Sequence, residues 1–340
     1  MADPWTAQRT QAIVTGFGEA ERIALADSPV PRPRKRDVLV RVTHASVGST
    51  DVLARRGGYL LQPMVGFTPG YDFVGVLETV TGSAELLGLR VGSRVVGCLP
   101  RMGSHTTHLV LDPSFLIRVP DALDSAVAAT SPLDLVTAAL ALRMAMIPAG
   151  GSVLIQGVTG AVGAFAAQHG VQAGLSVFGT ASVRSRPEAE RLGATFVDYA
   201  DPAWPIRVRD ASGGGVDGAI DHTGSPLVRK AVSPHGTLVH TAFVGTPGRE
   251  RRDTATGGIT SGVRRWSRPR ERVCSVPLFV ETQRKAYREM LTGELELLAS
   301  GVLTAPKVVA VPFGEVWDAQ RLAEHPEPRT KVVLEMPSAD

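Results

Sequence analysis

Residues 151–168 read GSVLIQGVTGAVGAFAAQ, and this stretch decides the fold. Ser152–Gln156 has the length and apolar composition of a strand that is buried on both faces. Glycines follow at positions 157, 160 and 163, and the apolar pattern predicts a helix over Val162–Ala173. A strand, a glycine turn and a helix in this order form a site for a pyrophosphate, because backbone N–H groups and the helix N-terminus can face its oxygens.

The glycine spacing is G-x-x-G-x-x-G instead of the usual G-x-G-x-x-G, so the glycines alone are a weak signal, and packing in a tight turn is the alternative explanation. The strand before them, the helix after them and a further strand at the expected distance favour dinucleotide binding. The residues of the turn that we expect to bind the cofactor are Gly157, Thr159, Gly160, Ala161, Val162 and Gly163.

The residues after the second predicted strand, Leu175–Gly179, indicate which dinucleotide is bound. An NAD site usually has Asp or Glu here, whereas this chain has no carboxylate before Glu188. Two arginines and a serine suit a 2′-phosphate, because guanidinium forms charge-assisted hydrogen bonds with it, although a solvated basic loop would have the same composition. NADPH is therefore the predicted cofactor. Its expected ligands in this segment are Thr180, Ser182, Arg184 and Arg186.

Strand and helix patterns alternate around this core, which predicts right-handed βαβ units in a parallel sheet. The expected helices are Leu133–Ile147 and Pro187–Leu192, and the expected strands are Ala194–Tyr199, Val216–Asp221 and Gly236–Val244. Arg249–Arg272 holds eight arginines among Gly, Thr and Ser, so we expect a loop there.

The two ends of the chain have a different pattern. Short strands separated by Gly and Pro predict a small, mainly antiparallel β domain, although an unrelated barrel would look the same. These strands are Val38–Val42, Phe73–Val80 and Arg94–Leu99. Near the C-terminus we expect a long helix, Thr282–Ser300, followed by strands at Lys307–Val311 and Lys331–Glu335.

The composition is that of an ordinary globular protein. A length of 340 residues suits two domains, and a net charge of +3 provides no general attraction for nucleic acid. The two cysteines, Cys98 and Cys274, form neither a disulfide framework nor a C-x-x-C motif. Met1–Thr10 is polar and lacks the apolar core of a signal peptide, and no stretch is long and apolar enough to span a bilayer. A cytoplasmic location is expected.

Together the segments resemble the medium-chain dehydrogenase/reductase superfamily, specifically its zinc-independent quinone oxidoreductase and enoyl reductase branch. The resemblance rests on VLVRVTHASVGSTDVLARRGGY (38–59), PGYDFVGVLE (69–78), residues 151–168, VDGAIDHTG (216–224) and KVVLE (331–335). It implies an α/β protein with a split, β-rich GroES-like catalytic domain and an inserted Rossmann domain, a doubly wound parallel sheet that binds NADPH. The corresponding boundaries are 1–130 for the first catalytic part, 131–275 for the Rossmann domain, and 276–340 for its last helix and the return to the catalytic domain. The active site would lie between the domains, and a homodimer is expected.

Zinc-dependent relatives bind their metal through Cys, a Gly-His-Glu sequence and a further Cys or His. This chain has Gly48, Tyr71 and Asp72 at the first matching positions, and it lacks the four-cysteine lobe. His105 and His108 have a spacing found in metal sites, but two histidines alone are weak evidence. We therefore expect no metal.

Without a Lewis acid, the expected chemistry is hydride addition to a carbon that is already electron-poor, as in an enone or a quinone. The resemblance implies that Tyr59 lies near the substrate, although an aromatic filling the cleft is an equal alternative. It also places Thr137 near the nicotinamide and Thr50 at a proton-relay position. Tyr199 and Thr223 complete the expected cofactor residues. Gly48 stands where quinone oxidoreductases have Asn. Because glycine lacks the amide side chain, we expect a larger pocket at this position.

These expectations leave three functions open. The first is an NADPH-dependent enone or enoyl reductase, in the setting of polyketide-type secondary metabolism. The second is an NADPH:quinone oxidoreductase, and the third is a non-catalytic NADPH- or RNA-binding protein on the same fold, for which Trp266 offers one stacking side chain. Arg249–Arg272 would be a substrate lid, a patch for an acyl carrier protein or a solvated loop. Expected partners are a small enone or quinone and a second copy of the chain, whereas nucleic acid and membrane are disfavoured.

Overall fold

A computed structural model describes residues 8–244, 246 and 248–338. The first seven residues of the polar stretch Met1–Thr10 lie outside this description. The chain divides into two compact units, which we call the β-rich unit (1–136 and 276–340) and the parallel-sheet unit (137–275). Across the described residues, no helix has both the length and the apolar character that a membrane span needs.

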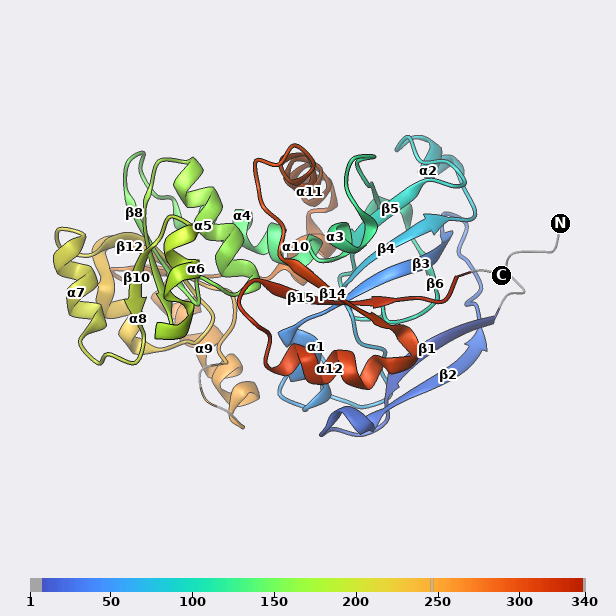
Figure 1. Cartoon of the computed structure of the whole chain (residues 1–340), viewed down its shortest axis with the longest axis horizontal. Helices are drawn as coiled ribbons and strands as arrows, with labels where there is room; N and C mark the ends of the chain where they lie inside the picture. Colours follow the sequence, from blue (N-terminus) through green and yellow to red (C-terminus); the bar gives the residue numbers. More distant parts are fainter. Residues whose placement is uncertain (1–7, 245, 247, 339–340) are drawn as a thin grey trace. The chain divides into compact units, whose positions relative to one another are not determined.

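The β-rich unit is built around a seven-stranded sheet to which both ends of the chain contribute (Figure 1). The strand order is β14-β15-β3-β4-β5-β7, with β6 pairing β3. C-terminal β15 pairs antiparallel with β3, so that Val332 faces Val47. The strands are β3 (Val38–Val47), β4 (Asp72–Leu77), β5 (Arg94–Cys98), β6 (His108–Leu111), β7 (Ile117–Arg118), β14 (Lys307–Pro312) and β15 (Thr330–Glu335). A separate antiparallel pair consists of β1 (Gln8–Val14) and β2 (Ile23–Pro29).

The helices of the β-rich unit are α1 (Ser49–Arg55), α2 (Gly82–Glu85), α3 (Ser125–Ala129), α10 (Val276–Thr282), α11 (Arg284–Ala299) and α12 (Val316–Glu324). Of these helices, α3, α11 and α12 lie against the strands of the sheet. The predicted helix over Thr282–Ser300 starts two residues later than expected, because Gln283 adopts φ −130° and ψ 48° and separates α10 from α11. Helix α4 (Pro132–Ala145) runs from one unit into the other.

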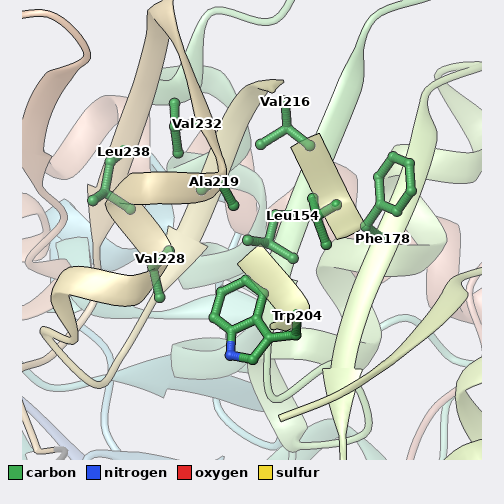
Figure 2. Packing of buried hydrophobic residues seen from close by; sticks show 10 residues of the cluster. Leu154, Phe178, Trp204, Val216, Ala219, Val228, Val232 and Leu238 are labelled. Atoms are coloured by element: carbon green, nitrogen blue, oxygen red, sulfur yellow. The ribbon is translucent and has the colours of Figure 1, made fainter. Parts of the chain in front are cut away.

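The parallel-sheet unit has six strands in the order β10-β9-β8-β11-β12-β13, and every neighbouring pair is parallel. The strands are β8 (Ser152–Gln156), β9 (Ser176–Ala181), β10 (Thr195–Asp198), β11 (Val216–Asp221), β12 (Val232–His240) and β13 (Arg270–Val273). Its helices are α5 (Ala161–Gln172), α6 (Arg186–Arg191), α7 (Trp204–Ala211), α8 (Pro226–Ala231) and α9 (Glu250–Arg264). Figure 2 shows part of the core, in which Leu154, Ala219 and Leu238 of the sheet pack with Trp204 and Val228 of the helices.

The prediction of a loop over Arg249–Arg272 is wrong, because α9 and the edge strand β13 occupy most of it. Glycines within α9 weaken its intrinsic helix propensity, so contacts with the rest of the unit stabilise it. The buried Glu271 of β13 accepts hydrogen bonds from Ser261 (3.1 Å) and Arg264 (3.4 Å) of α9. Phe243 packs so closely on Gly257 that a Cβ there would lie 2.3 Å from the ring. These partners are distant in sequence, and local composition does not reveal them.

Candidate functional site

The glycine turn between β8 and α5 is shaped by close backbone contacts. Gly157 has φ +69°, in the left-handed region that favours glycine. A Cβ on Gly163 would lie 2.2 Å from the carbonyl oxygen of Gly157 and 2.9 Å from the Cα of Val158. At Gly160 the nearest atom to such a Cβ is 3.2 Å away. The first and third glycines are therefore required by the path of the backbone itself.

Helix α5 begins directly at this turn, with Gly160 as its N-cap. The N–H groups of its first turn, including those of Ala161, Val162 and Gly163, have no intrahelical acceptor by geometry, and the helix dipole adds partial positive charge there. Thr159 lies within the turn and is buried. A turn with glycines at 157 and 160 before a helix N-terminus fits a pyrophosphate, which is what the sequence predicts for these residues.

Thr180 supports the turn from the end of β9. Its buried hydroxyl donates to Oε1 of Gln156 (2.8 Å) and accepts the N–H of Gly157 (3.0 Å). Both hydrogen bonds of this hydroxyl are made to other residues of the chain. The structure thus gives Thr180 a role in holding Gly157, whereas the sequence suggested direct contact with the cofactor.

The segment after β9 holds the residues expected at the 2′-phosphate. The hydroxyls of Ser182 and Ser185 are 3.1 Å apart. Nε of Arg186 donates to Glu190 (2.7 Å), and its guanidinium lies 5.5 Å from the ring centre of Phe196. Arg184 is exposed and has no ion pair among the residues that the structure describes. Of the two arginines, Arg184 has the guanidinium more available to an anion.

Two further expected cofactor residues lie near strand ends. Tyr199 follows β10 and is 55% exposed. Thr223 follows β11, and both its N–H (2.8 Å) and its hydroxyl (2.7 Å) donate to Oδ1 of Asp221. Asp221 therefore orders the turn that carries Thr223.

A charged network around His240 escaped the sequence analysis. Nδ1 of this buried imidazole is 3.0 Å from Asp221 and Nε2 is 3.5 Å from Glu271, so the ring links the ends of β11 and β12 to β13. Arg229 contacts Glu271 at 2.5 Å. Burial disfavours the imidazolium, but hydrogen bonds to the two carboxylates outweigh it and raise the pKa of His240. Burial likewise opposes ionisation of Glu271, yet the bonds from His240, Ser261 and Arg229 lower its pKa to about 2.

In the β-rich unit, Tyr59 is paired with a second tyrosine. The hydroxyls of Tyr59 and Tyr71 are 2.8 Å apart, and their rings meet edge to face at 6.4 Å. Tyr71 is buried, whereas Tyr59 is partly exposed. Burial raises the pKa of Tyr59 to about 12, against the opposing effect of the hydrogen bond to Tyr71, and burial also raises the pKa of Tyr71. Both phenols therefore keep their protons at neutral pH.

Gly48 lies beside a buried ammonium group. A Cβ on Gly48 would lie 3.2 Å from Nζ of Lys331, which is 2.6 Å from Asp134. Burial opposes the charge on Lys331, but Asp134 and Asp72 outweigh this effect and raise its pKa. Burial raises the pKa of Asp72 to about 7, and Lys331 limits that rise. The space that glycine leaves at position 48 is therefore bordered by Lys331.

The remaining candidates occupy separate places. Thr50 lies in the first turn of α1, and Thr137 is buried in α4. Nε2 of His105 lies 2.9 Å from the carbonyl oxygen of Ser46, whereas His108 lies 3.8 Å from Glu78. Within the described ranges, no group of three His, Cys, Asp or Glu side chains is placed to hold a metal ion.

Comparisons with known proteins agree with this architecture. Residues 34–121 match the alcohol dehydrogenase GroES-like domain. The quinone oxidoreductase of Pongo abelii is 33% identical over 167 residues, which cover 48% of this chain and 50% of that protein. A mycocerosic acid synthase-like polyketide synthase of Mycobacterium tuberculosis is 29% identical over 345 residues, covering 95% of this chain and 15% of that protein.

The superposition on the solved structure of the JamJ enoyl reductase covers 97% of this chain and 100% of that one. The TM-score is 0.83 and the sequence identity is 18%. At this identity, the likeness shows a shared fold. The match spans about half the length of the quinone oxidoreductase named above. The fold class expected from the sequence, a β-rich GroES-like domain with a parallel-sheet domain, is confirmed.

Proposed function

We propose that this chain, which belongs to the medium-chain dehydrogenase/reductase superfamily, is a zinc-free oxidoreductase that uses NADPH to reduce the C=C bond of an α,β-unsaturated carbonyl compound. The observation that carries the proposal is the turn at Gly157–Gly163, in which a Cβ on the third glycine would meet the backbone at 2.2 Å. Such a turn leaves room for a pyrophosphate at the N-terminus of α5.

The preference for NADPH is supported by the residues after β9. An adenosine ribose there would meet Ser182 and the exposed Arg184, and the segment between the end of β9 and Glu188 contains no carboxylate that could bind its hydroxyls. A guanidinium and a hydroxyl are suited to a 2′-phosphate, because both can donate charge-assisted hydrogen bonds to its negatively charged oxygens. Bound NADPH would supply a hydride for the β-carbon of the substrate.

Tyr59 is the proposed hydrogen-bond donor to the carbonyl oxygen of the substrate, and water is the proposed source of the proton for the α-carbon. Reduction of an enone leaves negative charge on the carbonyl oxygen and needs a proton at the α-carbon. With a pKa raised to about 12 by burial, Tyr59 is protonated at neutral pH and can donate a hydrogen bond to that oxygen. Tyr71 fixes its hydroxyl at 2.8 Å and thereby limits the directions in which it can donate.

The zinc-free chemistry is proposed from the residues at the matching positions. Gly48 and Tyr71 offer neither a thiolate nor an imidazole, and the carboxyl of Asp72 is directed to the backbone N–H of Leu133 at 3.0 Å. Substrates that are already electron-poor need no metal to polarise them. A quinone meets the same requirement, and the identity to quinone oxidoreductases makes NADPH:quinone reduction the second candidate.

Two partners belong to the same proposal. A homodimer is expected from the resemblance, and light scattering of the purified protein tests it directly. The 29% identity to a polyketide synthase over 95% of this chain favours a substrate of polyketide type, carried as a thioester on an acyl carrier protein.

The test is a fluorescence titration of metal-free protein with NADPH and with NADH, followed by a panel of enones and quinones. We expect NADPH to bind roughly tenfold more tightly than NADH, because charge-assisted bonds to one phosphate contribute about 1.5–3 kcal/mol. Oxidation of NADPH by enones in preference to quinones is the expected turnover. Failure of both nucleotides to bind would refute the proposal, and turnover with quinones alone would select the second candidate.

A further inference from the structure

Helix α9 and the turn that follows it carry an exposed apolar row that takes no part in the proposed reaction. Ile259, Val263 and Trp266 are 71%, 73% and 80% exposed, and Ala255 is exposed as well. Ala255, Ile259 and Val263 are spaced four residues apart, so they lie on one face of the helix, and Trp266 follows two residues after its last residue, Arg264. We call these four residues the α9 stripe.

The opposite face of α9 attaches the helix to its own unit. Ser261 is buried and donates to Glu271, and Arg264 reaches the same carboxylate. Gly257 packs under Phe243. Since the attached residues and the stripe lie on opposite sides, the stripe faces away from the sheet, and α9 is seen at the edge of the parallel-sheet unit in Figure 1.

Arginines lie at both ends of the stripe. Arg251 and Arg252 precede it, and Arg265 and Arg268 are at its other end; all four are exposed. Within the described part of the chain, none of the four has an ion pair. The guanidinium of Arg265 lies 4.8 Å from the ring centre of Trp266, which it leaves 80% exposed. The surface is therefore an apolar row with positive charge at each end.

The occupant must supply both apolar contact and negative charge. A second copy docking through the same stripe would place arginines opposite arginines, because a two-fold interface brings identical patches together. Nucleic acid would need aromatic or hydrogen-bonding side chains along the row, and three of the four residues are aliphatic. A protein helix with carboxylates at its two ends satisfies both demands.

We propose that the α9 stripe is a docking site for an acidic amphipathic helix of a partner protein. Within the helix the row runs from Ala255 to Val263, a rise of about 12 Å at 1.5 Å per residue, which matches about two turns of a partner helix. The apolar side chains of that helix would cover Ile259, Val263 and Trp266, and its terminal carboxylates would pair with the arginines. The proposal depends on the contacts of α9 alone and is independent of the reductase activity.

Two synthetic helical peptides of about 16 residues test this proposal. Both carry leucines at one face with the spacing of the stripe; one has glutamates at its ends and the other has lysines. Fluorescence anisotropy of the labelled peptides measures binding to the full chain. We expect the glutamate peptide to bind at least roughly tenfold more tightly, and low salt to widen the difference.

Matched variants locate the surface. Ile259→Asp, and separately the pair Arg251→Glu and Arg252→Glu, are expected to weaken binding of the glutamate peptide roughly tenfold. Ile206→Asp is the control, because Ile206 is 64% exposed on α7 of the same unit and should leave binding unchanged. NADPH binding is measured in parallel and reports on the folding of every variant. The docking proposal itself does not depend on NADPH binding.

Several results would overturn the inference. Equal affinity for the two peptides, or an equal loss in the Ile206→Asp variant, would show that contact is non-specific. Vesicles of phosphatidylglycerol or a single-stranded RNA that bind through Ile259 and the arginines, while the glutamate peptide does not bind, would assign the surface to a membrane or to nucleic acid. Self-association that Ile259→Asp abolishes, without peptide binding, would assign it to a second copy.

Discussion

Replacing Gly163 with Ala tests the glycine turn at the point where its geometry is least tolerant. The added Cβ would lie 2.2 Å from the oxygen of Gly157, 2.9 Å from its carbonyl carbon and 2.9 Å from the Cα of Val158. All three are backbone atoms, so no side chain can rotate to make room. The variant can fold only if the turn and the first residues of α5 move apart.

The magnitude follows from two opposing effects. Overpacking of this kind costs about 1–3 kcal/mol, and contact with backbone places Gly163→Ala in the upper part of that range. Alanine in place of glycine within a helix stabilises the helix by about 1 kcal/mol, because alanine has the higher helix propensity. The expected net loss in the free energy of unfolding is therefore about 1–2 kcal/mol. NADPH binding should weaken roughly tenfold or more, because the displaced N–H groups are those proposed to face the pyrophosphate.

Urea denaturation measures the first quantity and NADPH fluorescence titration measures the second. Gly293→Ala is the control: Gly293 lies in α11, and a Cβ there would meet no atom within 4 Å. That variant should gain about 0.4–1 kcal/mol of stability and bind NADPH normally. A Gly163→Ala protein with the wild-type unfolding midpoint and the wild-type affinity for NADPH would refute the steric reasoning.

Three further predictions follow from the site. Combined Arg184→Ala and Arg186→Ala substitutions should weaken NADPH binding roughly tenfold and leave NADH binding unchanged, as measured by fluorescence titration; parallel losses for both nucleotides would contradict a 2′-phosphate contact. Tyr71→Phe should lower kcat for an enone roughly tenfold with KM little changed, and Tyr59→Phe should lower it further; an unchanged kcat in both variants would remove Tyr59 from the mechanism. Because the pKa of His240 is raised on folding, its contribution to stability is complete below the unfolded value of about 6.5 and is lost as pH rises through the higher folded value. The urea midpoint should therefore fall with increasing pH more steeply in the wild type than in His240→Gln, and identical slopes would argue against the network.

Much of the fold could be predicted because each element depends on its own residues. Ser152–Gln156 and Val216–Asp221 are β8 and β11 with the expected bounds, since a strand buried on both faces needs a continuous apolar run. Val162–Ala173 matches α5 to within one residue at each end. The loop predicted over Arg249–Arg272 was wrong, because the stability of α9 comes from Glu271 and Phe243 and not from its own helix propensity.

The candidate site was predictable to the same extent. The glycine turn has a sequence signal, because a backbone path that excludes side chains requires glycine at particular positions. The residues that contact these expected site residues have no such sequence signal. Asp134 and Lys331 are separated by 197 positions, and the hydroxyl of Tyr71 reaches Tyr59 only through the packing of the β-rich unit.

The sequence alone thus determined the features that depend on consecutive residues: the strands and helices of the parallel sheet, the turn at Gly157–Gly163, and the lack of a carboxylate between β9 and Glu188. Tertiary structure decided which charges meet and which faces remain open. It placed His240 between two carboxylates, Lys331 beside Gly48, and the apolar row of α9 on the outer side of a helix. The physical reason is that backbone conformation is a local property, whereas ion pairs and burial depend on segments that only folding brings together.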